Sequence, residues 1–183
     1  TIIPGGLYSN QQGYIISYGS GKLTINRLAS VAWVGGASGN WSSAANWAGG
    51  AIPDYANVAA VTIRTGVTVT YDSAVPGTTT LTTLSNLGNL VMAAGTLHTT
   101  GNLSTAGFRQ NGGTLNVDGA LAIRSISGAV TLGNITAGSL NIGSKGGAIT
   151  QLAATTLNVK GTGAVPADKG LGGTSGVKYG ITL

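Results

Sequence analysis

The chain has 183 residues, carries a net charge of +5 and is only 7% charged, against ~25% in an average soluble protein. Its nine Lys and Arg residues are scattered singly, which argues against a nucleic-acid partner, since such proteins gather basic charge on one stripe. The absence of cysteine excludes disulfides and cysteine-ligated metal sites, and the 42% hydrophobic content excludes a disordered chain.

Glycine is the most over-represented residue, with 32 copies, whereas an average chain has ~7% glycine. Without a collagen-like period, this excess serves turns and close approaches of the backbone. No apolar run reaches the ~18 residues of a membrane-spanning helix, so we expect no transmembrane segment. The sequence opens on Thr-Ile-Ile-Pro rather than on a signal peptide, and we expect a processed chain or a piece of a longer protein.

Residues 13–18 and 22–26 are predicted to form the two strands of a hairpin, joined by a turn at Gly19, Ser20 and Gly21. A lone hairpin is marginally stable, so it needs a partner sheet. The segment contains the pattern GL-(x)n-Y-x-I-x-Y-x-x-G-x-L-T-I, made by Gly6, Leu7, Tyr14, Ile16, Tyr18, Gly21, Leu23, Thr24 and Ile25. This pattern resembles the closing strands of MBG/YDG-type β-sandwich repeats in large bacterial surface adhesins. The resemblance implies that residues 1–30 end such a repeat.

Residues 31–63 hold all three tryptophans of the chain, separated by small residues. Their spacing is similar to a motif that begins the β-helical regions of autotransporters and of two-partner-secreted, filamentous haemagglutinin-like proteins; the matching residues are Trp33, Gly35, Trp41, Asn46, Trp47, Pro53 and Val58. We expect Trp33, Trp41, Trp47 and Pro53 to form a structural cap on the first turn of a β-solenoid, because each indole can bury ~150–250 Å². The alternative is that the rings are exposed and stack on sugars.

Residues 64–183 are predicted to form the solenoid itself. Short apolar alternations separated by Gly, Asn and Ser occur at 67–71, 79–84, 89–93, 96–100, 113–117, 120–123, 129–132, 139–142, 148–152 and 155–159. A tetrapeptide recurs as TLNV at 114–117, SLNI at 139–142 and TLNV at 156–159, at intervals that bracket a ~20-residue turn. The fold class is therefore all-β, a right-handed parallel β-helix of roughly six turns, ~29 Å long.

Polar residues between and along these strands have two candidate roles. Asparagine tolerates turn conformations and bonds to nearby backbone, so we expect turn ladders of Asn86, Asn89, Asn102, Asn134 and Asn141. Threonine pairs at 78–83 and 99–100 raise an ice-binding alternative, but the Thr-x-Thr units do not persist beyond about residue 105.

The residues that could carry out catalysis are few. Glycoside hydrolysis needs paired carboxylates; Asp54 and Asp72 are the candidate pair at the first turns, and they lack supporting acids. The only histidine, His98, is expected to point outward from a Thr-rich strand, with no second His or Cys to share a metal. We therefore expect no enzyme activity, no catalytic or metal-binding residues, and no cofactor.

The two ends are candidates for association. Residues 177–181 read as a final strand without a cap, and the hairpin could add to it in another copy; the residues concerned are Tyr14, Ile16, Tyr18, Leu23, Ile25, Val177, Tyr179 and Ile181. The expected partners are other copies of the chain or further turns of the same polypeptide, together with surface glycans or matrix polysaccharide.

The resemblance implies a function as well as a fold. It predicts an extracellular or cell-surface stalk segment of a bacterial filamentous adhesin, which mediates cell–cell or cell–matrix attachment and biofilm formation. The alternative is a carbohydrate-binding or polysaccharide-degrading β-helix.

Overall fold

The computed structural model describes residues 14–19 and 22–161. Its regular elements are β-strands apart from one short 3-10 turn, η1 (Ala44–Asn46), so the described chain is all-β as predicted. The strands are β1 (Tyr14–Gly19), β2 (Lys22–Ala32), β3 (Ser38–Asn40), β4 (Val58–Ile63), β5 (Thr68–Tyr71), β6 (Thr78–Leu81), β7 (Thr83–Met92), β8 (Thr96–Thr99), β9 (Leu103–Gln110), β10 (Thr114–Ser125), β11 (Val130–Leu132), β12 (Asn134–Ser144), β13 (Ile149–Gln151) and β14 (Leu157–Val159).

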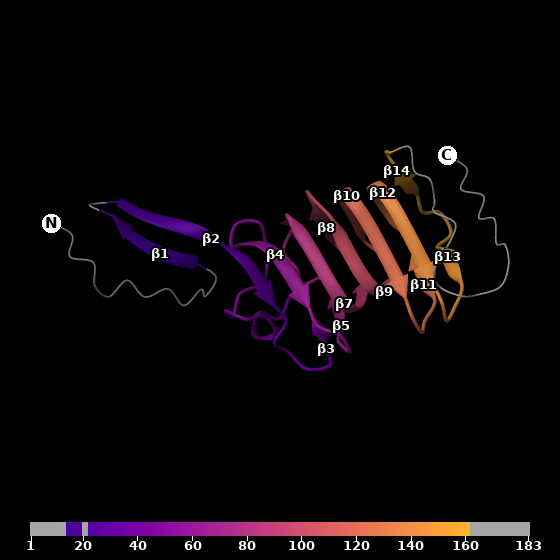
Figure 1. Ribbon diagram of the computed structural model, residues 1–183, viewed down its shortest axis with the longest axis horizontal. Helices are drawn as coiled ribbons and strands as arrows, with labels where there is room; N and C mark the ends of the chain where they lie inside the picture. The colour runs from indigo at the N-terminus through magenta and orange to yellow at the C-terminus, as the bar shows by residue number, and fades with distance from the viewer. Residues whose placement is uncertain (1–13, 20–21, 162–183) are drawn as a thin grey trace.

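Parallel pairing between successive turns makes the chain a β-solenoid. Leu84 of β7 lies beside Leu103 of β9, which lies beside Leu121 of β10. The pattern continues from Leu121 to Leu140 of β12. The result is a stack of about five turns, in which the strands follow one another along the long axis (Figure 1). The predicted β-solenoid is confirmed, while its right-handed sense stays a prediction.

Each turn contributes to three stacks of strands, because the long strands bend at a corner and serve two stacks. The first stack contains the C-terminal part of β2, then β4, the first halves of β7 and β9, and the second halves of β10 and β12. The second contains β3, β5, the second halves of β7 and β9, β11 and β13. The third contains β6, β8, the first halves of β10 and β12, and β14.

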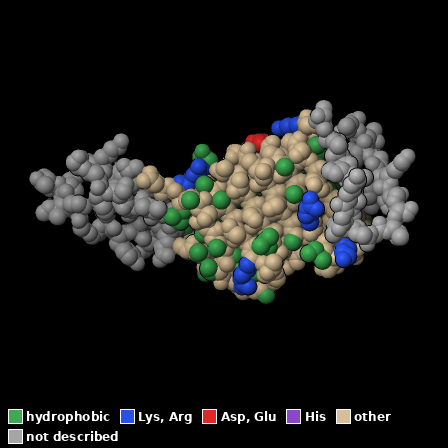
Figure 2. Space-filling view, in the orientation of Figure 1, with side chains coloured by type: hydrophobic (Ala, Val, Ile, Leu, Met, Phe, Trp, Pro, Cys, Tyr) green, Lys and Arg blue, Asp and Glu red, His purple; other side chains and the backbone are tan. Residues whose placement is uncertain are grey.

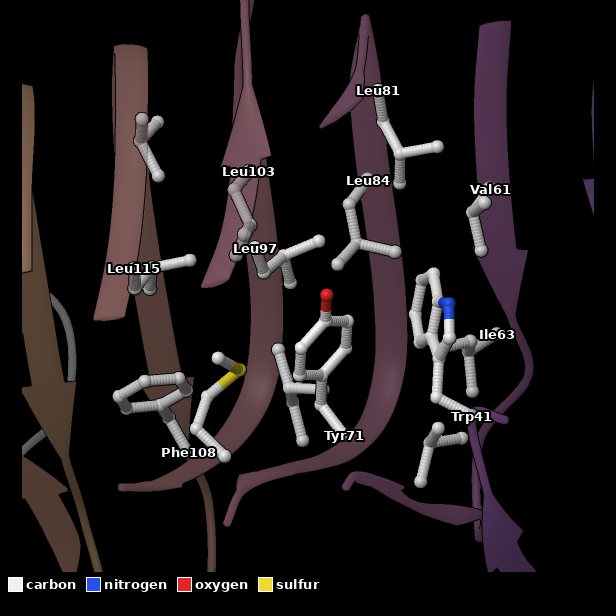
Figure 3. Packing of buried hydrophobic residues seen from close by; sticks show 14 of the residues in the cluster. Trp41, Val61, Ile63, Tyr71, Leu81, Leu84, Leu97, Leu103, Phe108 and Leu115 are labelled. Atoms are coloured by element: carbon white, nitrogen blue, oxygen red, sulfur yellow. The ribbon is translucent and has the colours of Figure 1, made fainter. Parts of the chain in front are cut away.

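The core runs through the middle of these stacks. In β7, buried and exposed residues alternate, so Leu84 and Leu90 point inward while Ser85 points to solvent. Equivalent residues of neighbouring turns lie in line inside the coil, as Figure 3 shows for Val61, Leu84 and Leu103. Each fully buried aliphatic side chain contributes ~1.5–3 kcal/mol relative to an exposed one. Stability therefore accumulates turn by turn.

Only two of the three copies of the recurring tetrapeptide lie at equivalent positions of the solenoid turns. The copies at 114–117 and 156–159 both lie in the third stack, and Ile135 lies between their leucines, Leu115 and Leu157. The middle copy at 139–142 belongs to the first stack, where it pairs with residues 120–123. The interpretation of all three copies as equivalent positions was wrong, because β12 is long enough to pass through two stacks.

Residues 103–110 form strand β9, which was not predicted. Alternation breaks there because Gly107 and Phe108 are both buried. Gly107 pairs with Asn89 of the previous turn, and a Cβ at Gly107 would collide with the Asn89 side chain. A glycine required by the neighbouring turn thus interrupts the apolar pattern.

The predicted hairpin is present. Strand β1 pairs antiparallel with residues 22–27 of β2, from Tyr14 beside Arg27 to Gly19 beside Lys22. Strand β2 is longer than expected, because Leu28–Ala32 continues as the first strand of the solenoid and pairs parallel with β4. Figure 1 shows the hairpin extending from that end of the coil. The division of the chain at residues 30 and 63 stays a prediction.

Candidate functional site

The first turn of the solenoid is filled by three indoles. Trp33, Trp41 and Trp47 are 3%, 0% and 1% exposed. The Trp33 and Trp47 ring centroids lie 5.0 Å apart at 89°, and those of Trp41 and Trp47 lie 4.6 Å apart at 62°. These edge-to-face contacts favour a fixed cluster. The predicted burial of the tryptophans is confirmed, and none has a free ring face on which a sugar could stack.

Two of the three indole N–H groups hold the loop that carries these rings, while the buried Trp41 Nε1 has no hydrogen-bond partner among the residues that the structure describes. Trp33 Nε1 donates to the Gly36 carbonyl oxygen at 3.0 Å, and Trp47 Nε1 donates to the Trp41 carbonyl oxygen at 2.8 Å. Glycine is needed beside Trp33, because a Cβ at Gly35 would lie 2.9 Å from its ring and 2.5 Å from Asn46 Oδ1. Pro53 is also buried, against Leu28 and Val58 among others. Their role as a structural cap stays a prediction.

Trp41 connects the cluster to the second turn. Its ring lies 5.6 Å from that of Tyr71 in β5, and Figure 3 shows it between Ile63 and Tyr71. The Tyr71 hydroxyl donates to the Thr96 carbonyl oxygen at 2.7 Å and accepts from the Thr79 N–H at 3.3 Å. Burial raises the pKa of Tyr71, and the nearby carboxylates of Asp54 and Asp72 add to this rise. Tyr71 therefore contacts residues of three successive turns: Trp41 in the turn before, Thr79 in its own turn and Thr96 in the turn after.

Asp54 and Asp72 each connect neighbouring turns. Asp54 Oδ1 accepts from the N–H of Thr80, one turn further on, at 3.2 Å. Asp72 Oδ2 accepts from the N–H of Ser42, one turn earlier, at 3.3 Å. Each carboxylate also accepts a local N–H, from Tyr55 at 2.6 Å and Ala74 at 2.9 Å. Each carboxylate thus holds one local backbone N–H and one from a neighbouring turn, which suits both groups to structural ties.

Side-chain amides connect turns at the corners. Gln110 is fully buried; its Oε1 accepts from the Gly133 N–H at 3.0 Å, while Nε2 donates to carbonyl oxygens of Gly113 and Asn134. Asn102 Oδ1 accepts from Ala120 N–H at 2.9 Å, and Asn134 Oδ1 accepts from Thr156 N–H at 3.0 Å.

The expected asparagine ladder therefore needs correction. Asn86 donates to Thr105 Oγ1 at 3.0 Å, and Asn89 donates to Thr68 Oγ1 at 3.4 Å. These amides bond to the backbone of the next turn or to a threonine of an adjacent turn, which is the next turn for Asn86 and the previous one for Asn89. Gln110 was missed because the sequence prediction considered only asparagine at the turns.

His98 points outward from β8, as expected, and its partner is Asp118 of β10. Nε2 lies 2.9 Å from Asp118 Oδ2, with the side chains 28% and 50% exposed. The sequence could indicate this contact only through the length of the turn. Asn116 pairs with His98, so Asp118, two residues further along β10, lies within reach of the histidine. A contact as exposed as this one contributes little to stability, ~0–1 kcal/mol. In the residues that the structure describes, no group of three His, Cys, Asp or Glu side chains could hold a metal.

The third stack presents two outward columns of short polar side chains. One contains Thr78, Thr96, Thr114, Asn134 and Thr156, and the other contains Thr80, His98, Asn116, Thr136 and Asn158. Asparagine and histidine interrupt the threonines, so the uniform array that the ice-binding alternative needs is not formed by these columns.

An open hollow of about 450 Å³ lies where the second stack meets the third. Residues 110–113, 133–134, 152–153 and 155 line it, and none of them is charged or aromatic. Ligand sites of this size are usually lined by aromatic side chains with a few placed polar groups. This lining therefore gives little support to the carbohydrate alternative.

Other expected features fall partly or wholly outside the described residues. Val177, Tyr179 and Ile181 lie beyond residue 161 and are not described. In the hairpin, the backbone of Ile16 pairs with Ile25 and that of Tyr18 with Leu23. Across the described chain, no helix has the length and apolar character that crossing a membrane requires. Comparison with protein-family models, curated proteins and solved structures gave no match.

Proposed function

We propose that this chain is a stiff stalk segment of a secreted or cell-surface filamentous adhesin. The observation that carries the proposal is the continuous parallel pairing of about five turns around one buried core. Hydrogen bonds between turns run along the rod, so bending the rod would lengthen those on its outer side. Each additional turn extends the rod by ~4.8 Å. Such a unit holds a binding region at a fixed distance from its anchor.

The polar groups of the solenoid support a structural role. Asp54, Asp72 and Gln110 each make at least one hydrogen bond to a neighbouring turn. The buried tryptophans fill the first turn. The resemblance of residues 6–25 to surface-adhesin repeats and of residues 33–58 to haemagglutinin-like proteins adds the cellular context. On this proposal the chain works outside the cell, in attachment and biofilm formation, and it can assemble into fibres through its ends.

Display on a non-adherent bacterium tests the stalk function. The chain is placed between a surface anchor and a head that binds a known immobilised ligand, and attachment is counted under flow. The matched control replaces residues 22–161 by a Gly-Ser linker of about 20 residues, whose r.m.s. end-to-end distance of ~25 Å equals the length of the rod but is not held fixed. The stalk should support attachment to ligands recessed beneath a polymer brush, where the linker should fail.

Two results would contradict the proposal. Equal attachment with the linker would show that stiffness is irrelevant. Attachment by the displayed chain without a head, abolished by soluble polysaccharide, would favour the carbohydrate-binding alternative instead.

A further inference from the structure

One corner of the solenoid carries a line of exposed apolar and basic residues. Ala32 pairs with Thr62, which places Val34 beside Arg64. Ile63 pairs with Asn86, which places Arg64 beside Leu87. The first stack ends here and the second begins, so the side chains at these equivalent positions project from a convex edge.

The same line continues through the later turns. Thr105 pairs with both Asn86 and Ile123, so Ala106 and Arg124 occupy the next equivalent positions. In the last turn Gly143 pairs with Arg124, while Ser125 pairs with Ser144, so Ile126 and Lys145 lie beside each other two residues further along their turns. We call the line and these two flanking residues the corner ridge; it consists of Val34, Arg64, Leu87, Ala106, Arg124, Ile126 and Lys145. At one turn per ~4.8 Å it extends for about 24 Å.

Hydrophobic exposure is concentrated on the corner ridge. Val34, Leu87 and Ile126 are 58%, 55% and 70% exposed. They are three of the four large hydrophobic residues exposed between residues 26 and 161, where side chains are described. The fourth, Tyr55, has the Arg27 guanidinium 4.2 Å above its ring. Isolated exposed apolar residues are ordinary, but two in line at one corner with a third two residues further along the turn indicate a surface that meets something partly apolar.

The distribution of charged residues indicates that the partner of the corner ridge carries negative charge. Arg64, Arg124 and Lys145 are exposed on the corner ridge. The carboxylates of the described residues lie at the other corners: Asp54 precedes β4, Asp72 follows β5, and Asp118 lies where β10 passes from the third stack to the first. In Figure 2, which shares the view of Figure 1, the visible acid lies at the upper margin with a basic side chain near it, and further basic and hydrophobic side chains are spread over the visible surface.

We propose that the corner ridge docks on a lipid bilayer with anionic headgroups, so that the rod lies along the membrane surface. Arginine and lysine would meet the headgroups, while Val34, Leu87 and Ile126 enter the boundary between headgroups and acyl chains. A convex edge fits a flat, deformable surface. A polysaccharide would instead be expected to use a groove with aromatic platforms, and the ridge has neither. This inference does not depend on the proposed stalk function.

Vesicle co-sedimentation at low ionic strength tests the proposal. The purified full chain is mixed with vesicles of phosphatidylcholine and phosphatidylglycerol, and with pure phosphatidylcholine vesicles. The chain should sediment with the anionic vesicles and stay in the supernatant with the neutral ones. Removing two charges by the double substitution Arg124→Gln/Lys145→Gln should weaken binding by about 25-fold, at roughly fivefold per cation. The double substitution Leu87→Ser/Ile126→Ser should weaken it by about tenfold or more.

The matched control, Arg109→Gln/Lys160→Gln, removes the same charge from exposed positions off the ridge and should change binding by about twofold or less. Circular dichroism establishes that every variant is folded. The proposal is overturned if the chain ignores anionic vesicles, or if the control weakens binding as much as Arg124→Gln/Lys145→Gln does. A third outcome would also overturn it: Leu87→Ser/Ile126→Ser leaves vesicle binding unchanged, and soluble polygalacturonate binds to the ridge as tightly as the vesicles do. The ligand would then be any polyanion, and the acyl chains of a bilayer would contribute nothing to binding.

Discussion

Gln110 and Gly133 face each other across one turn of the solenoid, and each requires the identity of the other. The glycine N–H donates to Gln110 Oε1 at 3.0 Å, and a Cβ on the glycine would lie 2.6 Å from Gln110 Cδ. The amide fills the space that a side chain at 133 would occupy. The same relationship recurs at Asn102 and Gly119, where the Cβ would lie 2.5 Å from Oδ1. Together with Gly107, which lies against Asn89, these glycines accommodate amide side chains of adjacent turns.

Substitution of Gly133 by alanine should destabilise the protein by ~1–3 kcal/mol, because the added methyl group overpacks the corner. Gly36→Ala is the matched control, since the nearest atom lies 4.0 Å from its added Cβ, and it should cost less than ~0.5 kcal/mol. Urea denaturation measures both. Gln110→Ala should cost ~1–3 kcal/mol for each buried backbone group left unpaired. The double variant should cost less than the sum of the two, and strict additivity would contradict the direct contact.

Truncation of Trp47 to alanine should cost ~3–5 kcal/mol, because the side chain is 1% exposed and contacts both other indoles. Trp41→Ala should destabilise the protein by a similar amount. Trp47→Phe should cost ~1–3 kcal/mol, since it leaves the Trp41 carbonyl without its donor. Tyr55→Ala, at an exposed ring, serves as the control. Melting temperatures unchanged within error for both alanine variants would eliminate the structural cap.

Alkaline pH should destabilise the fold through Tyr71. Burial raises its pKa above the ordinary value of 10.0, so the unfolded chain loses this proton first. The contribution is therefore complete below pH ~10 and is lost as pH rises from there through the folded pKa. Thermal unfolding at increasing pH should show this loss in the native protein and a smaller loss in Tyr71→Phe. Identical pH profiles for the two proteins would contradict a buried, protonated phenol.

The chain should release no reducing ends from a panel of neutral and acidic polysaccharides, because Asp54 and Asp72 are bound to backbone N–H groups of other turns. Asp54→Asn and Asp72→Asn should instead lower the melting temperature, since a charge-assisted hydrogen bond becomes a neutral one. Sugar release that disappears in both variants, with stability unchanged, would identify them as catalytic.

The sequence was sufficient to predict the fold class, the hairpin and most strands, because apolar alternation and turn residues are local signals. It was insufficient to predict register. The copies of the tetrapeptide at 139–142 and 156–159 look equivalent, yet they lie in different stacks because the strands bend through corners. The partnership of His98 with Asp118 and the corner ridge depend on that register. They could be recognised only once the turn length at each position was known.

The most direct test of the account is to change the number of turns. Thr96 and Thr114 are equivalent positions one turn apart, so deletion of residues 97–114 removes one turn in register, and a tandem duplication of the same segment adds one. The matched control deletes residues 97–105, half of that segment, and places second-stack residues where third-stack residues belong. The measurement is the maximum dimension from small-angle X-ray scattering, with circular dichroism to establish folding. We predict that both in-register variants fold, the deletion variant being ~4.8 Å shorter than the native protein and the duplication variant ~4.8 Å longer. The control that lacks residues 97–105 should be unfolded. Unfolding of both in-register variants, or lengths that do not follow the number of turns, would contradict it.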